Sequence, residues 1–217
     1  MQGLFGLCGV ILAAGESSRM GTDKALLPWP PPAPDAPANP HRTLLTAAIL
    51  AFEPLTRAIV VVAGKNADSL APIAAACGAY LARNPNPSLG QFSSLQIGLR
   101  AVLDHGCDSA MITPVDCPPL APSSLALLCE SFRRAVVRNF WAVAPENNGK
   151  HGHPLLASAT LIHRFIEAPV AGNARDILHA HSDRIEYVSV PDDLSRSGMN
   201  TSEEYASYVE SLTPPAD

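Results

Sequence analysis

The stretch VILAAGESSRMGTDK, residues 10–24, runs from an apolar, β-branched segment directly into a loop of small residues. Gly15 and Gly21 permit backbone conformations that other residues avoid, and the small side chains around them leave room for a ligand. Successive backbone N–H groups in such a turn form a concavity that binds anions. Arg19 and Lys24 add two positive charges to the same loop. The stretch therefore predicts a buried strand followed by a phosphate-binding loop.

The spacing of this loop differs from that of two common phosphate-binding motifs. A P-loop requires G-x-x-x-x-G-K-[ST], whereas five residues separate Gly15 from Gly21 and Lys24 does not directly follow the second glycine. The dinucleotide-binding pattern G-x-G-x-x-G is missing as well. A glycine-rich turn that caps an ordinary helix is the alternative interpretation, but the strand, the small residues and the two cations together favour phosphate binding.

These residues resemble the signature L-A-[AG]-G-x-S-x-R-M-G-x-x-K of the molybdenum-cofactor nucleotidyltransferases, the MobA-like group of NTP transferases. Every specified position matches. Ala13-Ala14 resembles the cytidylyltransferase branch, whereas the guanylyltransferase branch typically has two glycines there. The resemblance implies that Arg19 and Lys24 act in catalysis. It also implies nucleotide binding by Leu12, Ala13, Ala14, Gly15, Ser17, Arg19 and Lys24.

Length and composition fit one nucleotidyltransferase domain that spans residues 1–217. Of the 217 residues, 47% are hydrophobic, which is enough for a sizeable core. The net charge of −5 argues against nucleic acid as a partner. The apolar run at 4–14 is too short to span a bilayer, and no cationic region precedes it. We therefore expect a soluble, cytoplasmic protein with no nucleic-acid or membrane partner.

Apolar runs alternate with helical patterns along most of the chain. Strands are predicted at 7–13, 58–63, 79–82, 109–113, 141–145, 154–157 and 185–190. Helices are predicted at 43–52, 66–77, 92–103, 123–137, 159–167, 174–181 and 202–212, with Asn66 or Asp68 as the cap of the second. This alternation indicates βαβ units, and therefore a Rossmann-like α/β fold with a mostly parallel sheet and helices on both faces.

Two segments depart from this pattern. The proline-rich residues 28–41 can form neither a helix nor a central strand, so we expect an extended loop inserted into the domain. Residues 213–217 are expected to form a disordered tail.

The cysteines are scattered and odd in number: Cys8, Cys77, Cys107, Cys117 and Cys129. Because they contain no C-x-x-C pair, neither a disulfide framework nor a structural zinc site is expected. Most of them should instead be small buried hydrophobic residues.

Asp116 follows the predicted strand at 109–113 and is flanked by prolines. It lies in the segment Thr-Pro-Val-Asp-Cys-Pro, residues 113–118. A carboxylate at a strand end is a good ligand position for Mg²⁺, although an aspartate before proline often only forms a turn. The segment also resembles the family's D-x-P motif, whose aspartate binds the metal. Since both the glycine loop and Asp116 follow strands, both are expected at the same edge of the sheet.

The segment 84–95 resembles the family's N-P-x-x-x-x-G-x-x-S-S-L element, which faces the nucleotide base and ribose. From the residues alone, Ser93 and Ser94 indicate no more than the capping of a helix. The resemblance implies that Asn84, Ser93 and Ser94 contact the nucleotide.

Three further segments resemble family elements less closely. Residues 151–154 resemble R-G-H-P, with His151 at the arginine position, and Arg175 lies in a segment resembling G-A-R. The resemblance implies that His151, His153 and Arg175 bind the acceptor; no carboxylate or cysteine lies at a spacing that would make the histidines a zinc site. The segment 198–203 resembles D-x-D-T-P-E, which implies Asn200 as a second Mg²⁺ ligand beside Asp116, although an amide carries less charge than a carboxylate.

The implied reaction is the transfer of a nucleoside monophosphate, with CTP favoured over GTP, onto a phosphorylated small-molecule acceptor, molybdopterin or the molybdenum cofactor. A maturation factor for molybdoenzymes is a further partner that the resemblance allows. Two alternatives stay open: a nucleotidyltransferase for a sugar or alcohol phosphate, and a non-catalytic nucleotide sensor.

Overall fold

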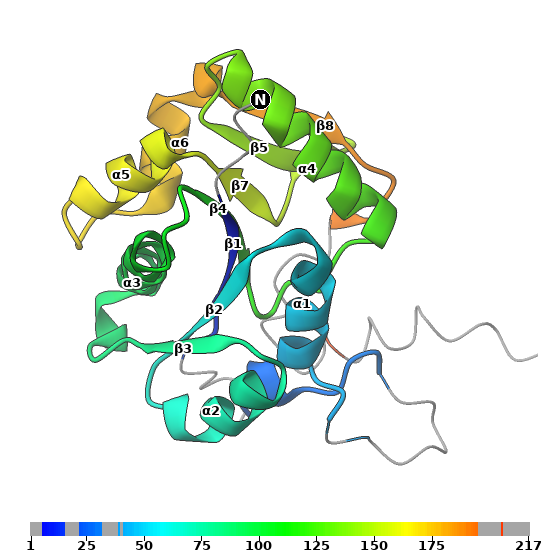
Figure 1. Cartoon of the computed structure of the whole chain (residues 1–217), viewed down its shortest axis with the longest axis vertical. Helices are drawn as coiled ribbons and strands as arrows, with labels where there is room; N and C mark the ends of the chain where they lie inside the picture. Colours follow the sequence, from blue (N-terminus) through cyan, green and yellow to red (C-terminus); the bar gives the residue numbers. More distant parts are fainter. Residues whose placement is uncertain (1–5, 16–21, 32–38, 40, 195–204, 206–217) are drawn as a thin grey trace, which may run out of the picture.

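The computed structural model describes residues 6–15, 22–31, 39, 41–194 and 205. Eight strands among them form one sheet in the order β3-β2-β1-β4-β7-β5-β6, with β8 beside β5 (Figure 1). The strands β1 to β4 run parallel, β7 is antiparallel to both β4 and β5, and β8 is parallel to β5. The strands are β1 (Leu7–Leu12), β2 (Ala58–Ala63), β3 (Tyr80–Arg83), β4 (Ser109–Pro114), β5 (Ala142–Asn147), β6 (Lys150–His151), β7 (Leu155–Ala157) and β8 (Ile185–Ser189).

Helices cover both faces of this sheet, as the sequence predicts (Figure 1). The α-helices are α1 (Leu44–Phe52), α2 (Ala67–Ala76), α3 (Gln91–Asp104), α4 (Pro122–Val137), α5 (Ala159–Glu167) and α6 (Ala174–Ala180). Short 3-10 helices are η1 (Lys24–Leu26), η2 (Glu53–Leu55), η3 (Pro87–Leu89) and η4 (Ser182–Arg184). Within the described part of the chain, no helix is long and apolar enough to cross a membrane.

The two faces of the sheet build two separate cores, because successive side chains of a strand point to opposite sides. On β1, Ile11 packs into the core beneath α1, α2 and α4. Its neighbours Val10 and Leu12 pack into the core beneath α3, α5 and α6. Gly98 lets α3 approach the sheet closely, since a Cβ atom there would lie 2.7 Å from a methyl carbon of Val10. The central strands are therefore buried on both sides.

The predicted strands and helices within the described residues are confirmed, with ends that differ by about two residues or fewer. Strand β6 was not predicted; it forms a hairpin with β5 through Asn148 and Gly149, which both have positive φ. Its two residues are too few to show a strand period. The predicted helix at 202–212 and the tail at 213–217 lie outside the described residues, apart from Tyr205.

The proline-rich segment 28–41 is described only at its two ends. Pro28 forms a β-bridge with Thr43, and the Trp29 N–H donates to the Arg42 carbonyl at 2.9 Å. The two ends therefore lie side by side, as expected for a loop inserted into a continuous domain.

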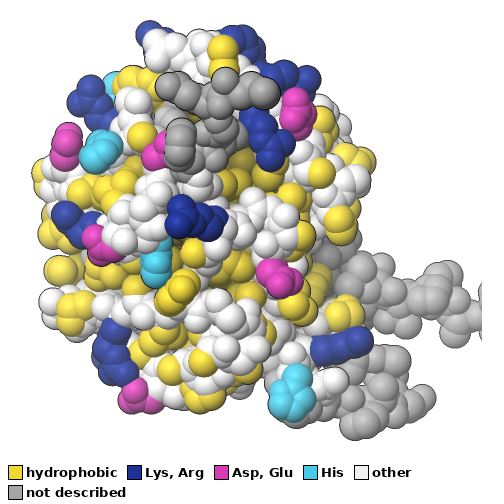
Figure 2. Space-filling model, viewed as in Figure 1, with side chains coloured by type: hydrophobic (Ala, Val, Ile, Leu, Met, Phe, Trp, Pro, Cys, Tyr) yellow, Lys and Arg dark blue, Asp and Glu magenta, His cyan; other side chains and the backbone are white. Residues whose placement is uncertain are grey.

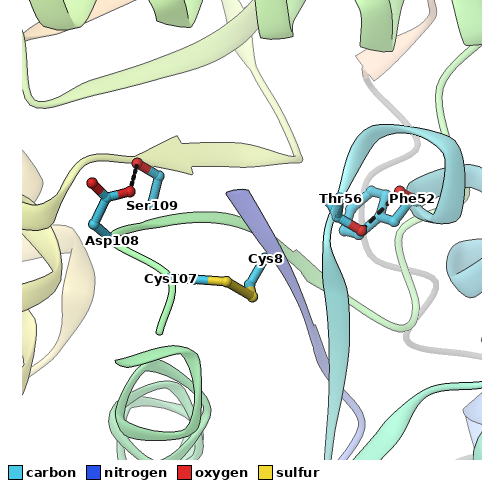
Figure 3. The surroundings of a disulfide bond; sticks show 6 residues. All are labelled: Cys8, Phe52, Thr56, Cys107, Asp108 and Ser109. Atoms are coloured by element: carbon cyan, nitrogen blue, oxygen red, sulfur yellow. Dashed lines mark hydrogen bonds between the residues drawn. A yellow bond between two sulfur atoms is a disulfide. The ribbon is translucent and has the colours of Figure 1, made fainter. Parts of the chain in front are cut away.

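The expectation that the cysteines form no disulfide framework is wrong for one pair. Cys8 on β1 and Cys107, two residues before β4, form a disulfide with a Cα–Cα distance of 6.1 Å (Figure 3). The two residues are 99 positions apart, but β1 and β4 are neighbours in the sheet, which brings them together. Sequence spacing cannot reveal such a pair. The other three, Cys77, Cys117 and Cys129, are not disulfide-bonded.

Candidate functional site

The glycine loop and Asp116 leave the sheet at neighbouring positions. Leu12, the last residue of β1, pairs with Pro114, the last residue of β4. From β1 the chain continues to β2 and β3 on one side, whereas β4 lies on the other side. Such a switch point is where open α/β sheets bind ligands, outside the carboxyl ends of the strands. The expectation that both segments meet at one edge is confirmed.

Lys24 and Asp116 form an ion pair at this edge. The Lys24 Nζ donates to the Asp116 Oδ2 at 2.8 Å, and the two side chains are only 16% and 19% exposed. Lys24 is the first residue of η1, and Asp116 lies in the turn after β4. Because both groups are largely shielded from water, their charges interact more strongly than those of an exposed pair. A cation and a carboxylate are thus held side by side at the switch point.

The start of the glycine loop is firmly attached to the sheet. The Ala13 N–H donates to the Val62 carbonyl at 2.8 Å, and both Ala13 and Ala14 are buried. Gly64 lies against the loop: a Cβ atom there would be 2.9 Å from the Ala14 carbonyl oxygen, so a larger residue would push the loop aside. Gly15 is exposed. Ser17 and Arg19 lie outside the described residues.

Asn66 links the two ends of this loop. Its Nδ2 donates to the Ala13 carbonyl at 2.8 Å and to the Asp23 Oδ2 at 2.6 Å. Its Oδ1 accepts a hydrogen bond from the Gly64 N–H at 3.0 Å. Asn66 stands at the N-cap position of α2, as predicted, but its side chain makes these contacts and no capping bond to the helix. The sequence holds no signal for these contacts, since Ala13 and Asp23 are 53 and 43 positions away.

Asn84, Ser93 and Ser94 come together at the start of α3. The Asn84 Nδ2 lies 3.0 Å from the Ser93 Oγ and 2.9 Å from the Ser94 Oγ. All three residues are buried. The Asn84 Oδ1 also accepts from the Asn86 N–H at 2.9 Å, so the cluster fixes the turn that leads from β3 to α3. The predicted contact of these residues with a nucleotide stays a prediction.

The residues predicted to bind the acceptor lie in different environments. His151 is exposed on β6, and its ring stacks on Tyr187 of β8 with centroids 3.7 Å apart. His153 is more enclosed: burial lowers the pKa of its imidazole, while the Ile112 backbone and the charge of Asp116 act in the opposite direction. Its Nδ1 is buried and finds no hydrogen-bond partner among the residues that the structure describes. Arg175 is exposed in the first turn of α6.

Asp116 is the one predicted metal ligand that the structure describes, because Asn200 lies outside the described residues. Within the described ranges, no group of three or more His, Cys, Asp or Glu side chains could hold a metal ion. Mg²⁺ commonly takes only one or two carboxylates and completes its shell with substrate phosphates and water. The partly exposed carboxylate of Asp116 fits that kind of site and does not fit a cage made by protein ligands alone.

One face of the molecule, shown in Figure 2, carries charges of both signs. On the face shown in Figure 2, Lys and Arg side chains are spread out and acidic side chains lie among them. This distribution differs from the continuous basic surface that is typical of nucleic-acid binding proteins.

Comparison with known proteins places these features in a family. Residues 9–185 match the family described as the MobA-like NTP transferase domain. The molybdenum cofactor cytidylyltransferase of Escherichia coli (strain K12) is 29% identical over 171 residues, which cover 78% of this chain and 79% of that protein. A probable molybdenum cofactor guanylyltransferase of Mycobacterium avium (strain 104) is 31% identical over 171 residues, 79% of this chain and 78% of that protein.

Solved structures share the fold. The crystal structure of Rv0371c from Mycobacterium tuberculosis H37Rv matches with a TM-score of 0.73 at 21% identity, covering 95% of this chain and 99% of that chain. The crystal structure of its complex with manganese matches with a TM-score of 0.68 at 20% identity, covering 95% and 100% of the two chains.

Proposed function

The chain belongs to the MobA-like NTP transferase family of nucleotidyltransferases, and we propose that it transfers CMP from CTP onto a phosphorylated pterin, molybdopterin or the molybdenum cofactor, with release of pyrophosphate. One observation carries the proposal: the Lys24 ammonium and the Asp116 carboxylate lie 2.8 Å apart at the sheet edge where β1 and β4 end. This pair provides a cation for the phosphates of an NTP and an oxygen ligand for a metal at the same place.

The chemistry requires little from protein side chains beyond position and charge. In the proposed reaction, a phosphate oxygen of the acceptor attacks the α-phosphorus of the NTP and forms a new P–O bond. The bond between the α-phosphorus and the oxygen bridging to the β-phosphate breaks, and that oxygen leaves with pyrophosphate. The acceptor phosphate is already ionised at neutral pH, so it needs no base. Lys24 and Arg19 would neutralise the charge that grows on pyrophosphate.

A divalent cation, proposed to be Mg²⁺, would be held by Asp116 and Asn200. It would neutralise phosphate charge when bound. Rv0371c from Mycobacterium tuberculosis, which shares the fold, has been crystallised with manganese, and this supports a divalent cation in the proposal.

The acceptor would lie beside this centre. His153 is near enough to Asp116 for the carboxylate charge to influence its pKa. We propose that His151, His153 and Arg175 bind the phosphorylated acceptor. The nucleotide would lie between the glycine loop and the turn held by Asn84, Ser93 and Ser94.

The preference for CTP rests on Ala13-Ala14 and on the cytidylyltransferase of Escherichia coli among the relatives. Ala14 is buried, so its methyl group takes space beside the backbone that would face the base. The reduced space would weaken the binding of a purine base more than that of the smaller pyrimidine base. The relative from Mycobacterium avium is named for guanylyl transfer, so the nucleotide has to be tested directly.

The experiment is an assay of pyrophosphate release with Mg²⁺ and each of CTP, GTP and UTP. Each nucleotide is combined with molybdopterin, with a sugar phosphate or with no acceptor. The proposal predicts release that depends on molybdopterin and is fastest with CTP. Release that requires the sugar phosphate would assign a different acceptor. Nucleotide binding without release in any combination would identify a nucleotide sensor and contradict the proposal.

A further inference from the structure

We propose that Asn66 is a positioning residue that holds Lys24 in place through Asp23. This inference rests on the proposed function, in which Lys24 binds the phosphates of the NTP. Asn66 lies between β2 and α2, outside the glycine loop itself, and is partly buried.

The two N–H groups of the Asn66 amide have separate partners. The Ala13 carbonyl, at 2.8 Å from Nδ2, is at the start of the glycine loop directly after β1. The Asp23 Oδ2, at 2.6 Å, is at the end of the loop directly before Lys24. The Asn66 Oδ1 is held by the Gly64 N–H at 3.0 Å, which fixes the orientation of the amide. Asn66 therefore ties the end of the loop to the end of the central strand.

Asp23 connects Asn66 to the short helix that begins at Lys24. While its Oδ2 accepts from Asn66, its Oδ1 accepts from the Ala25 N–H at 3.0 Å and so caps η1. Its carbonyl accepts from the Leu26 N–H, also at 3.0 Å. Lys24 is the first residue of that short helix, and its Nζ reaches Asp116. The backbone of Lys24 thus depends on Asp23, and the orientation of Asp23 depends on Asn66.

A carboxylate in place of the amide separates this role from a local structural one. Asn66→Asp keeps the size of the side chain and an oxygen that can accept from Gly64. It loses both donors, and it places a negative oxygen against the Asp23 carboxylate and the Ala13 carbonyl. If Asn66 only shaped the turn between β2 and α2, this variant would leave nucleotide binding unchanged.

The test measures dissociation constants for CTP and GTP, and for CMP and GMP, with Mg²⁺ and without acceptor. For the NTP that binds the wild type more tightly, Asn66→Asp is expected to weaken binding about tenfold, the scale of one hydrogen bond to a charged group. Binding of the matching monophosphate, which lacks the phosphates that Lys24 would contact, should change less than about twofold on the same grounds. Ser69→Ala, an exposed position one turn further along α2, is the matched control.

The double variant Lys24→Ala/Asn66→Asp shows whether Asn66 acts through Lys24. The inference predicts the same NTP affinity as Lys24→Ala alone, because the residue that Asn66 positions is already gone. The exchange Asp23→Asn/Asn66→Asp returns a donor to the pair and should recover part of the affinity lost in Asn66→Asp. If thermal unfolding shows that Asn66→Asp is unfolded, Asn66→Ala removes the amide without adding a charge and is interpreted in the same way.

The outcomes distinguish the two levels of the proposal. Unchanged NTP affinity in Asn66→Asp, with weakened affinity in Lys24→Ala, overturns the role of Asn66 alone. The role of Asn66 is also overturned if the losses of NTP affinity in the two single variants add up in the double variant. The same holds if Asn66→Asp weakens the binding of NTP and of monophosphate equally. Unchanged NTP affinity in Lys24→Ala contradicts instead the place of Lys24 in the proposed function.

Discussion

The Lys24 Nζ donates a hydrogen bond to the Asp116 Oδ2 at 2.8 Å, joining two residues that are 92 positions apart in the sequence. Lys24 follows β1 and Asp116 follows β4, and these two strands are parallel neighbours in the sheet. In the proposed reaction the two groups have different partners, because the ammonium binds phosphate and the carboxylate binds a cation. Ligand binding must therefore loosen a contact that is present without ligands.

The ion pair predicts that a divalent cation competes with Lys24 for Asp116 when no nucleotide is bound. Lys24→Met removes the ammonium and keeps an apolar side chain of similar length. Without nucleotide, we expect the variant to bind Mn²⁺ about tenfold more tightly than the wild type, since the Lys24 ammonium no longer neutralises the Asp116 carboxylate. Titration followed by electron paramagnetic resonance measures this, and Lys150→Met is the control at an exposed lysine. Equal Mn²⁺ affinity in the wild type and Lys24→Met would contradict the competition.

The second prediction concerns the nucleotide. In the proposed function the methyl group of Ala14 would narrow the space against the base, and Ala14→Gly removes it; one methyl group in a pocket discriminates by roughly 1–3 kcal/mol. The wild type should therefore prefer CTP, and the variant should shift toward GTP. Competition kinetics with both nucleotides and the phosphorylated pterin measure the ratio of the kcat/KM values. A preference of the wild type for GTP would refute the cytidylyl assignment and leave the fold and family unchanged.

The third prediction concerns the disulfide between Cys8 and Cys107. Closing a loop of this length restricts the unfolded chain, so reduction is expected to lower the free energy of unfolding by up to about 4 kcal/mol. Cys8→Ala/Cys107→Ala, which places no hydroxyl in this buried core, should show a similar loss, and reductant should no longer affect its melting temperature. The bond lies near the amino ends of β1 and β4, away from Lys24, so NTP affinity should not change. A wild-type melting temperature that does not depend on reductant would mean that the bond contributes no stability.

The fourth prediction follows from His153. Burial lowers the pKa of this imidazole below its ordinary value of 6.5, whereas the unfolded chain retains the ordinary value. As the pH falls below about 6.5, the unfolded state binds the proton first, so the free energy of unfolding decreases. Above that pH, His153 is neutral in both states and contributes almost no pH dependence to the stability. Thermal unfolding between about pH 7.5 and 5 should show this decrease, and His153→Gln should reduce it. An NMR titration that places the pKa of His153 at or above 6.5 would contradict the prediction.

The sequence predicted most of the fold because its signals are local. The apolar run Ala58–Ala63 is buried on both faces and coincides with β2, and the strand–loop pattern after Leu12 correctly places the start of the glycine loop at the sheet edge. The pairing of Lys24 with Asp116 could be predicted only as far as a shared edge, since their distance depends on the register of β1 and β4. The contacts of Asn66 and the disulfide of Cys8 connect residues far apart, and no spacing along the chain indicates them.

The most direct test of the central claim follows the α-phosphate. Wild-type protein and Asp116→Asn are incubated with Mg²⁺, the phosphorylated pterin and CTP labelled at the α-phosphorus, and the label on the pterin is measured beside the affinity for CTP. The proposed function predicts that the wild type moves the label onto the pterin. Asp116→Asn should transfer it at least about a hundredfold more slowly, with a much smaller change in CTP affinity, because the cation that Asp116 would hold acts chiefly on the transition state. Label that never reaches the pterin, or transfer at a near-normal rate in Asp116→Asn, would contradict the account.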